Sequence, residues 1–382
     1  MEGADGSGFG LENLPFGAVA RGGDGPARPA VRIGERALIL EPLVEAGLLG
    51  DLPPGVLAGP VLNPFLALGR PAWSATRARI AALLRDGSPD REAAAAALVP
   101  LSEVEMRLPV AIGDYVDFYS SIEHASNVGR IFRPDAEPLL PNWRHLPVGY
   151  HGRASSVVVS GTPIRRPRGQ LPPAEPGQPP RFGPTERLDI ELELGFVTGP
   201  GNALGTPIPA TQVHEHVFGF VLVNDWSARD IQRWEYQPLG PFLGKSFATS
   251  ISPWVTPLEA LEPHRVPARA QDPPPLGYLE TTGDWALDID LEVELNGEVI
   301  SRTNARGLYW TFPQQLAHAT VNGTNVRPGD LYASGTISGS EPGSQGSFIE
   351  LQRPFLQDGD TVVLRGRAGD LSLGEVAGTI VP

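Results

Sequence analysis

The chain has no cysteine among its 382 residues and only one lysine, Lys245; every other basic side chain among the 30 counted is an arginine. The absence of cysteine excludes disulfide bonds, thiolate metal ligands and a cysteine nucleophile, so a metal could be held only by oxygen or histidine. Composition leaves two interpretations of Lys245 open. It is either a chance surface residue or a position that needs a compact ammonium, which a planar guanidinium replaces poorly.

Long apolar runs are also missing. No run approaches the roughly 18 residues of a membrane helix, and the first residues lack a basic segment followed by an apolar one. The net charge of −14 and the pI near 5.0 disfavour binding to nucleic acid or to an anionic membrane, because both need a positive surface. We therefore expect a cytoplasmic protein with no nucleic-acid or membrane partner, in which an anionic ligand would need a locally positive pocket.

Turn-forming residues are abundant, with 45 glycines and 41 prolines, which favours a β-rich fold with many loops. The length exceeds that of one typical domain. We expect a first region with short strands and two helices, followed by a β-dominated domain. The expected elements are strands at 30–33 and 36–40, helices at 75–85 and 91–98, strands at 157–159, 188–197, 217–223, 287–295 and 362–364, and helices after Trp226 and around 309–319.

Two features refine this outline. Asn296-Gly297 follows one predicted strand and predicts a hairpin turn. The stretches 163–184 and 253–275 are rich in proline, which cannot donate to a strand ladder, so we expect no central strand in either.

Paired carboxylates are the first candidate site. Glu191 and Glu193 alternate with aliphatic residues, so in a strand both project from one face, where they repel unless a cation lies between them. Residues 288–294 alternate in the same way, and the pattern does not separate a metal site from a half-solvated strand at either place. Asp225 follows the apolar run 217–223, which suits a ligand for a hard cation or, alternatively, the cap of a solvated amphipathic helix.

Other chemistry-bearing residues cluster near these carboxylates. If a helix follows Asp225, Arg229, Gln232, Arg233 and Tyr236 fall on one of its faces.

Histidines offer two further candidates. On a helix Asp117 and His124 would lie two turns apart on one face, with the imidazole available as a general base, although a lone histidine is more often structural. His214 and His216 form an H-x-H pair that we leave as background. Residues 240–246 miss the phosphate-loop spacing, and Pro241 removes an amide donor, so we reject nucleotide binding there.

Four segments, in order, resemble the fumarylacetoacetate hydrolase family: residues 117–121, 142–153, 224–246 and 334–339. The resemblance begins at 13–17 and runs nearly to the last residue. It implies a mainly β fold, with a small N-terminal SH3-like barrel (1–108) followed by a larger β-rich domain of mixed β-roll type (109–382) that binds metal, carries the active site and forms a homodimer.

The resemblance also implies a metal-dependent hydrolase that cleaves a carbon–carbon bond of 4-fumarylacetoacetate, giving fumarate and acetoacetate at the end of tyrosine and phenylalanine breakdown. The implied cofactor is Ca or Mg, or both. The implied metal-site residues are Asp117, Glu191, Glu193, Asp225, Lys245 and Thr249; the catalytic residues are His124, Glu350, Arg229, Gln232 and Lys245; the residues binding the diketo acid are Tyr119, Arg133, Tyr150, Gln232, Tyr236 and Thr336.

This assignment agrees with the chemistry. Water attack on one carbonyl and departure of a carbanion each develop negative charge, which a divalent ion and fixed cationic donors would stabilise. His124, paired with Glu350, could take the proton of water. Three alternatives stay open: a relative acting on another acylpyruvate or β-diketo acid, a decarboxylase or isomerase without an attacking water, and a non-catalytic metal-stabilised binding module. The His124–Glu350 pair favours hydrolysis.

Overall fold

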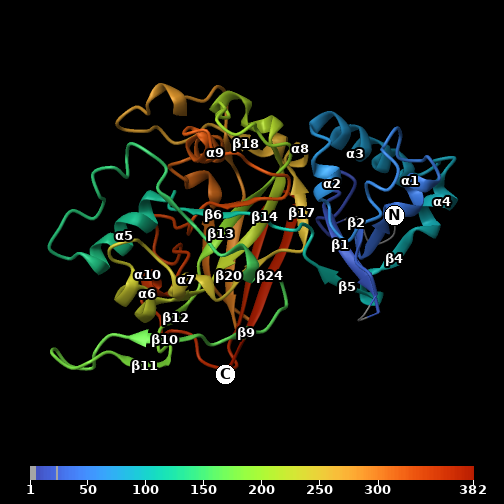
Figure 1. Cartoon of the computed structure of the whole chain (residues 1–382). Coiled ribbons are helices and arrows are strands. Elements are labelled where there is room, and N and C mark those ends of the chain that lie inside the picture. The colour runs from blue at the N-terminus through green and yellow to red at the C-terminus, as the bar shows by residue number, and fades with distance from the viewer. Residues whose placement is uncertain (1–5, 23–24) are drawn as a thin grey trace.

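The computed structural model describes residues 6–22 and 25–382. Residues 1–5, which begin the predicted N-terminal domain, and residues 23–24 lie outside the described part. An N-terminal domain packs beside a larger β-rich domain, and helices and long loops cover the far side of the larger domain (Figure 1). The predicted order, a small domain followed by a β-dominated one, is confirmed. The fold as a whole mixes helices and strands.

The N-terminal domain is built from five strands and four helices among its described residues. β1 pairs antiparallel with both β2 and β5, and β3 lies between β2 and β4. No pairing among the described strands closes this set into a barrel. The elements are β1 (Phe16–Arg21), β2 (Arg28–Ile33), β3 (Arg36–Ile39), α1 (Glu41–Glu45), α2 (Asn63–Leu66), α3 (Arg70–Leu84), α4 (Arg91–Ala96), β4 (Leu98–Pro100) and β5 (Val104–Arg107).

The large sheet runs through both domains. β1 pairs with β17, and from there the order continues as β14, β13, β22, β6 and β7, which gives a sheet of 13 described strands. β16 and β8 extend it to one side of β14. The strands are β17 (Trp254–Pro257), β14 (Val217–Asp225), β13 (Leu192–Thr198), β22 (Leu331–Ala333), β6 (Tyr115–Phe118), β7 (Gly149–His151), β16 (Thr249–Ile251) and β8 (Val157–Val159).

The prediction for the proline-rich stretch 253–275 is wrong, because β17 lies within it and pairs on both sides, with β1 and with β14. Pro253 precedes the strand and Pro257 ends it, so the amides of the residues between them are free to donate. The stretch 163–184 behaves as predicted. It contains only the edge strand β9 (Ile164–Arg165) and a two-stranded sheet, β10 (Arg168–Leu171) with β11 (Arg181–Pro184), that projects from the body (Figure 1).

A second sheet packs against the first in the C-terminal domain. Its order is β21, β20, β23, β24 and β9. The predicted hairpin is confirmed: Asn296 and Gly297 both have positive φ, 52° and 87°, between β20 and β21. The strands are β20 (Asp290–Leu295), β21 (Glu298–Asn304), β23 (Thr361–Ala368) and β24 (Leu371–Val381).

The remaining elements are short strand pairs and helices around the sheets. They are β12 (Leu188–Asp189) with β15 (Ser227–Ala228), β18 (Arg265–Val266) with β19 (Ala286–Leu287), and the helices α5 (Ile122–Phe132), α6 (Arg229–Glu235), α7 (Leu243–Ser246), α8 (Leu258–Leu261), α9 (Phe312–Thr320) and α10 (Phe348–Leu351). Within the described residues, no helix has the length and apolar character needed to cross a bilayer.

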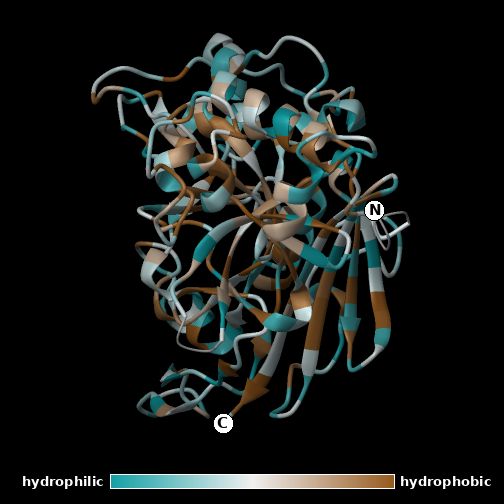
Figure 2. Cartoon of the chain, turned by 90° about the vertical axis from the view of Figure 1, so that its right-hand side faces the viewer, coloured by the Kyte–Doolittle hydropathy of each residue, from teal (hydrophilic) through white to brown (hydrophobic). Residues whose placement is uncertain are grey.

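β14 has all nine residues buried and separates two hydrophobic cores. Phe218 and Val221 face a core that includes Phe16 of the N-terminal domain, whereas Phe220 and Leu222 face the core between the two sheets. Figure 2 shows the hydrophobic residues along the long strands. Because β14 is covered on both faces, Asp225 at its end lies inside the protein.

β14 approaches β17, the strand that pairs with β1 of the N-terminal domain, closely enough for a test. Gly219 of β14 lies opposite Pro257 of β17, and a Cβ added at Gly219 would meet Thr256 O at 2.3 Å. We expect Gly219→Ala to lower the free energy of unfolding by about 1–3 kcal/mol, because the strands must separate. The measurement is the urea midpoint. Gly183→Ala is the control, since its Cβ would lie 3.9 Å from the nearest atom; equal midpoints for the two variants would contradict the prediction.

Candidate functional site

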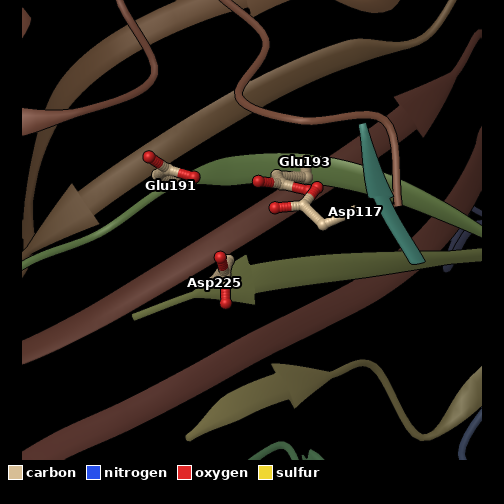
Figure 3. Close-up of side chains that lie close together, drawn as sticks. All are labelled: Asp117, Glu191, Glu193 and Asp225. Carbon is tan, nitrogen blue, oxygen red and sulfur yellow. The ribbon is translucent and has the colours of Figure 1, made fainter. Parts of the chain in front are cut away.

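Four acidic side chains meet where strands of the large sheet end. Asp117 comes from β6, Glu193 from β13, Asp225 from the last position of β14, and Glu191 from the residue before β13 (Figure 3). The antiparallel register places Leu192 opposite Asn224, which brings Asp225 beside Glu191. Each carboxylate offers an oxygen within 4.8 Å of the others, and among the described residues this is the group with metal-site spacing.

Burial makes this cluster costly without a cation. The exposed fractions of Asp117, Glu191, Glu193 and Asp225 are 2%, 5%, 0% and 0%. Asp117 Oδ1 and Glu193 Oε1 have no hydrogen-bond partner within the described residues. Burial, together with the neighbouring carboxylates, raises the pKa of Asp117 and of Glu193 well above its ordinary value. Such a set of unpaired carboxylate oxygens fits a hard divalent cation, which makes the cluster a candidate metal site.

Lys245 contacts this cluster directly, so the interpretation as a chance surface residue is wrong. It is 4% exposed, and its Nζ donates to Glu191 Oε2 at 2.5 Å and to Asp225 Oδ2 at 2.8 Å. Arg229 Nη1 donates to Glu191 Oε1 at 2.8 Å. Burial alone would raise the pKa of Glu191, but Lys245 and Arg229 hold it below its usual range. Glu191 is therefore the carboxylate of the cluster that carries its charge most securely.

Hydroxyl groups complete the contacts of Asp225. The Tyr150 hydroxyl donates to Asp225 Oδ2 at 3.0 Å, and the Thr249 hydroxyl donates to Asp225 Oδ1 at 2.9 Å. The pairing of β14 with β16 places Thr249 opposite Asp225. Burial nevertheless raises the pKa of Asp225, because the donors do not fully offset its desolvation.

His124 and Asp117 do not share a helix, so that part of the sequence interpretation is wrong. β6 ends at Phe118, and α5 begins at Ile122 after Ser121, whose hydroxyl accepts from the His124 amide. The tight turn between strand and helix still brings both side chains to one cavity.

The His124 ring pairs with a buried carboxylate from a distant segment. Nδ1 lies 2.6 Å from Glu350 Oε2. Glu350 also accepts from Ser338 Oγ, Ser347 Oγ and Asn127 Nδ2. Burial alone would raise the pKa of Glu350, but His124, Ser347 and Asn127 lower it to about 2. The pair therefore holds the ring by Nδ1 and leaves Nε2 as the nitrogen that can exchange a proton.

A cavity of about 400 Å³ lies against the acidic cluster and His124. Its wall combines apolar side chains with three cationic ones, Arg133, Arg229 and Lys245. The predicted site residues that line it are Asp117, Tyr119, His124, Arg133, Tyr150, Glu191, Arg229, Gln232, Tyr236 and Lys245. Three cationic side chains therefore line the cavity of this acidic molecule, beside its acidic cluster.

Five predicted site residues do not line the cavity. Glu193, Asp225, Thr249 and Glu350 lie behind the wall, the last three in contact with Lys245, Asp225 or His124. Thr336 is 1% exposed, and its hydroxyl has no partner in the part of the chain that the structure describes.

The second alternating stretch, residues 288–294, forms a half-solvated strand and not a metal site. Glu292 and Glu294 are partly exposed and pair with arginines: Arg302 lies 3.0 Å from Glu292, and Arg365 lies 2.7 Å from Glu294. Asp290, Glu292 and Glu294 therefore lie on the solvated face of β20. His214 and His216 stay background, since His214 pairs with Glu215 and His216 Nδ1 lies 2.6 Å from Pro200 O.

Sequence reasoning missed three residues that support the site. Asp189 contacts Arg229, and Ser338 and Ser347 contact Glu350. Two signals were available: Asp189 extends the alternation of Glu191 and Glu193 by one step, and Ser347 stands three residues before Glu350 in the spacing of a capping box.

Known proteins match the chain along nearly its full length. Residues 12–109 match the family profile described as "Fumarylacetoacetase N-terminal", and residues 115–381 match "Fumarylacetoacetate (FAA) hydrolase C-terminal". Fumarylacetoacetase of Homo sapiens is 48% identical over 413 residues, which cover 99% of this chain and 97% of the human protein. Fumarylacetoacetase of Arabidopsis thaliana is 47% identical over 404 residues, covering 98% and 96%.

Solved structures share the fold. A fumarylacetoacetate hydrolase from psychrophilic Exiguobacterium antarcticum aligns with a TM-score of 0.59 at 18% identity, covering 96% of this chain and 99% of that one. At this identity the likeness supports the fold alone.

The raised pKa of Glu193 gives a prediction for the metal-free protein. Its folded state favours the protonated form, so its contribution to stability falls as pH rises above its ordinary value of 4.5. In chelator, Glu193→Gln should therefore gain stability relative to wild type, by an amount that grows with pH above about 4.5. With Ca or Mg chloride added, wild type should gain thermal stability that Glu193→Gln does not.

The control for this experiment is Glu294→Gln, from the solvated alternating strand, which should respond to the cation like wild type. A cation response of Glu193→Gln equal to that of wild type would rule out the acidic cluster as the metal site.

Proposed function

The chain belongs to the fumarylacetoacetate hydrolase family, and from this membership we propose that it hydrolyses fumarylacetoacetate to fumarate and acetoacetate, the last step of tyrosine and phenylalanine breakdown. The observation that carries the proposal is the identity of 46–48% to fumarylacetoacetases over nearly the full length. The geometry agrees with it, because a buried acidic cluster and the His124–Glu350 pair adjoin one cavity.

We assign a divalent cation, Ca or Mg or both, to Asp117, Glu191, Glu193 and Asp225. The unpaired oxygens and raised pKa values of Asp117 and Glu193 support this assignment. When bound, the cation would supply positive charge to the diketone oxygens of the substrate. Thr249 adds a possible oxygen ligand beside Asp225. The protonated amine of Lys245 has no free lone pair, so its part in the metal site would be to hold the carboxylates of Glu191 and Asp225.

We assign the role of general base to His124. Its Nδ1 contact with Glu350 would fix the ring and stabilise the imidazolium that forms when Nε2 takes a proton from water. An isomerase or decarboxylase needs no base for an attacking water, and the buried pair therefore favours hydrolysis over these alternatives and over a non-catalytic binding module.

The cationic wall would stabilise the negative charge that develops on the attacked carbonyl. Arg229, Gln232 and Lys245 line the cavity, and Arg229 Nη2, a buried nitrogen, has no partner in the described chain and so keeps an unused donor.

The substrate carboxylates need donors at a distance from the acidic cluster. Arginine and tyrosine side chains suit them. For this role we propose Tyr119, Arg133, Tyr150, Gln232 and Tyr236, which line the cavity, and Thr336, which does not.

Family membership also carries expectations about the domain folds, the oligomeric state and the location of the protein. The SH3-like barrel (1–108), the mixed β-roll domain (109–382), the homodimer and the cytoplasmic location stay predictions. The solution mass of the protein would decide the oligomeric state.

The decisive experiment measures loss of the diketone absorbance of fumarylacetoacetate by purified protein with Mg or Ca. We expect turnover by wild type and a loss of about 10²- to 10⁴-fold in His124→Ala, because the base is removed. His264→Ala, away from the cavity, should turn over like wild type. If wild type leaves fumarylacetoacetate untouched while it cleaves another diketo acid, the specific assignment fails.

The single lysine supplies a second prediction. Lys245→Arg should fold, but it should lose at least about tenfold in turnover, because a planar guanidinium cannot reproduce two short contacts from one nitrogen in a buried site. Circular dichroism checks the fold, and kcat on fumarylacetoacetate checks the loss. Unchanged kcat would remove the lysine from the mechanism.

A further inference from the structure

We propose that Asp189 is a positioning residue that fixes Arg229 relative to the His124–Glu350 pair. The inference depends on the function proposed for the cavity. Asp189 is not among the cavity-lining residues, and it is fully buried with 0% exposure. A buried carboxylate of this kind is tolerated only when its oxygens are fully bonded.

Strand pairing places Asp189 next to Arg229. β12 pairs with β15 so that Asp189 lies opposite Ser227, two residues before Arg229. Its Oδ2 accepts from Arg229 Nε at 2.8 Å. The same guanidinium donates from Nη1 to Glu191 at 2.8 Å. Because a guanidinium is planar, these two anchors fix its plane and thereby the direction of Nη2, the nitrogen that is left without a protein partner in the described chain.

The same carboxylate also holds the segment that carries Glu350. Asp189 Oδ1 accepts from the Phe348 amide at 2.7 Å, and Oδ2 accepts from the Ile349 amide at 3.2 Å. These are the first two residues of α10, and Glu350 is the third. A helix of four residues has few internal hydrogen bonds, so its position depends on outside contacts.

One side chain therefore connects the two halves of the proposed reaction. Through Arg229 it reaches the group that would stabilise the oxyanion, and through α10 it reaches the partner of the base. A displacement of either group would reduce the stabilisation of the transition state more than the binding of the substrate. The reason is that the oxyanion and the imidazolium exist only after attack begins. The expected signature is a loss in kcat with little change in KM.

The chain contains a matched control in Asp230. It is also a buried carboxylate, at 8% exposure, and it belongs to α6 like Arg229. Its acceptors bind the Thr185 hydroxyl and the Glu186 amide, neither of which lines the cavity. Removing its charge shows how much kcat falls when a buried carboxylate that is not linked to the reacting groups is lost.

The test compares Asp189→Asn with Asp230→Asn on fumarylacetoacetate in the presence of Mg or Ca. An asparagine keeps the shape, but its amide nitrogen cannot accept, so either the contact with Arg229 Nε or the contact with the Phe348 amide is lost. We expect kcat of Asp189→Asn to fall about 10- to 100-fold with KM changed by less than about threefold, and kcat of Asp230→Asn to stay within about threefold of wild type. Asp189→Asn with kcat within threefold of wild type would overturn the inference.

A double-mutant cycle separates positioning from general destabilisation. In an Arg229→Gln background the contact to Asp189 is already lost, so Asp189→Asn should reduce kcat by less than it does in wild type. The same fold reduction in both backgrounds would also overturn the inference. If Asp189→Asn alone does not fold, the double variant Asp189→Asn with Arg229→Gln still tests the inference. It should fold, because both charges are removed. Its kcat should lie within about tenfold of that of Arg229→Gln. A larger loss would count against the inference.

These results are distinct from failure of the proposed function. If wild type itself does not hydrolyse fumarylacetoacetate, the function is wrong. If wild type is active and Asp189→Asn is equally active, only the role of Asp189 is wrong.

Discussion

The whole site depends on the burial of more negative charge than the protein neutralises by itself. Four carboxylates lie within reach of one another, and among the described residues only Lys245 and Arg229 donate hydrogen bonds from a charged side chain to them. The two cations secure Glu191, while Asp117 and Glu193 keep oxygens with no partner among the described residues. An unpaired buried charge is costly, so this deficit favours a cation at the cluster.

The sheet makes this burial possible. Asp225 ends a strand that is covered on both faces, and Glu193 and Asp117 come from β13 and β6, on either side of β22 in the same sheet. The described residues of the N-terminal domain are absent from the cavity wall, yet the core of this domain continues onto β14 through contacts such as Phe16 with Phe218. Its place in the architecture is to keep water from the rear of the strand that carries Asp225.

The sequence predicted the secondary-structure elements better than it predicted the burial and contacts of individual side chains. The hairpin at Asn296-Gly297 follows from local backbone preference alone and was predictable. The different outcomes for Glu191 with Glu193 and for Glu292 with Glu294 were not, because both pairs alternate identically and only tertiary packing buries the first pair. β17 was missed because its prolines stand at its ends, where they cost no ladder bonds. Asp189 was missed because its partners, Arg229 and α10, come from distant segments of the chain.

The composition of the chain has a chemical consequence for an enzyme acting on fumarylacetoacetate. The fumaryl group carries an electron-poor double bond conjugated to a carbonyl, and thiolates and free amines add readily to such bonds. This chain has no thiol, and its one side-chain amine is protonated and held by two carboxylates in a buried position. The protein can therefore meet a reactive electrophile at every turnover while offering it neither of the side-chain nucleophiles most prone to alkylation.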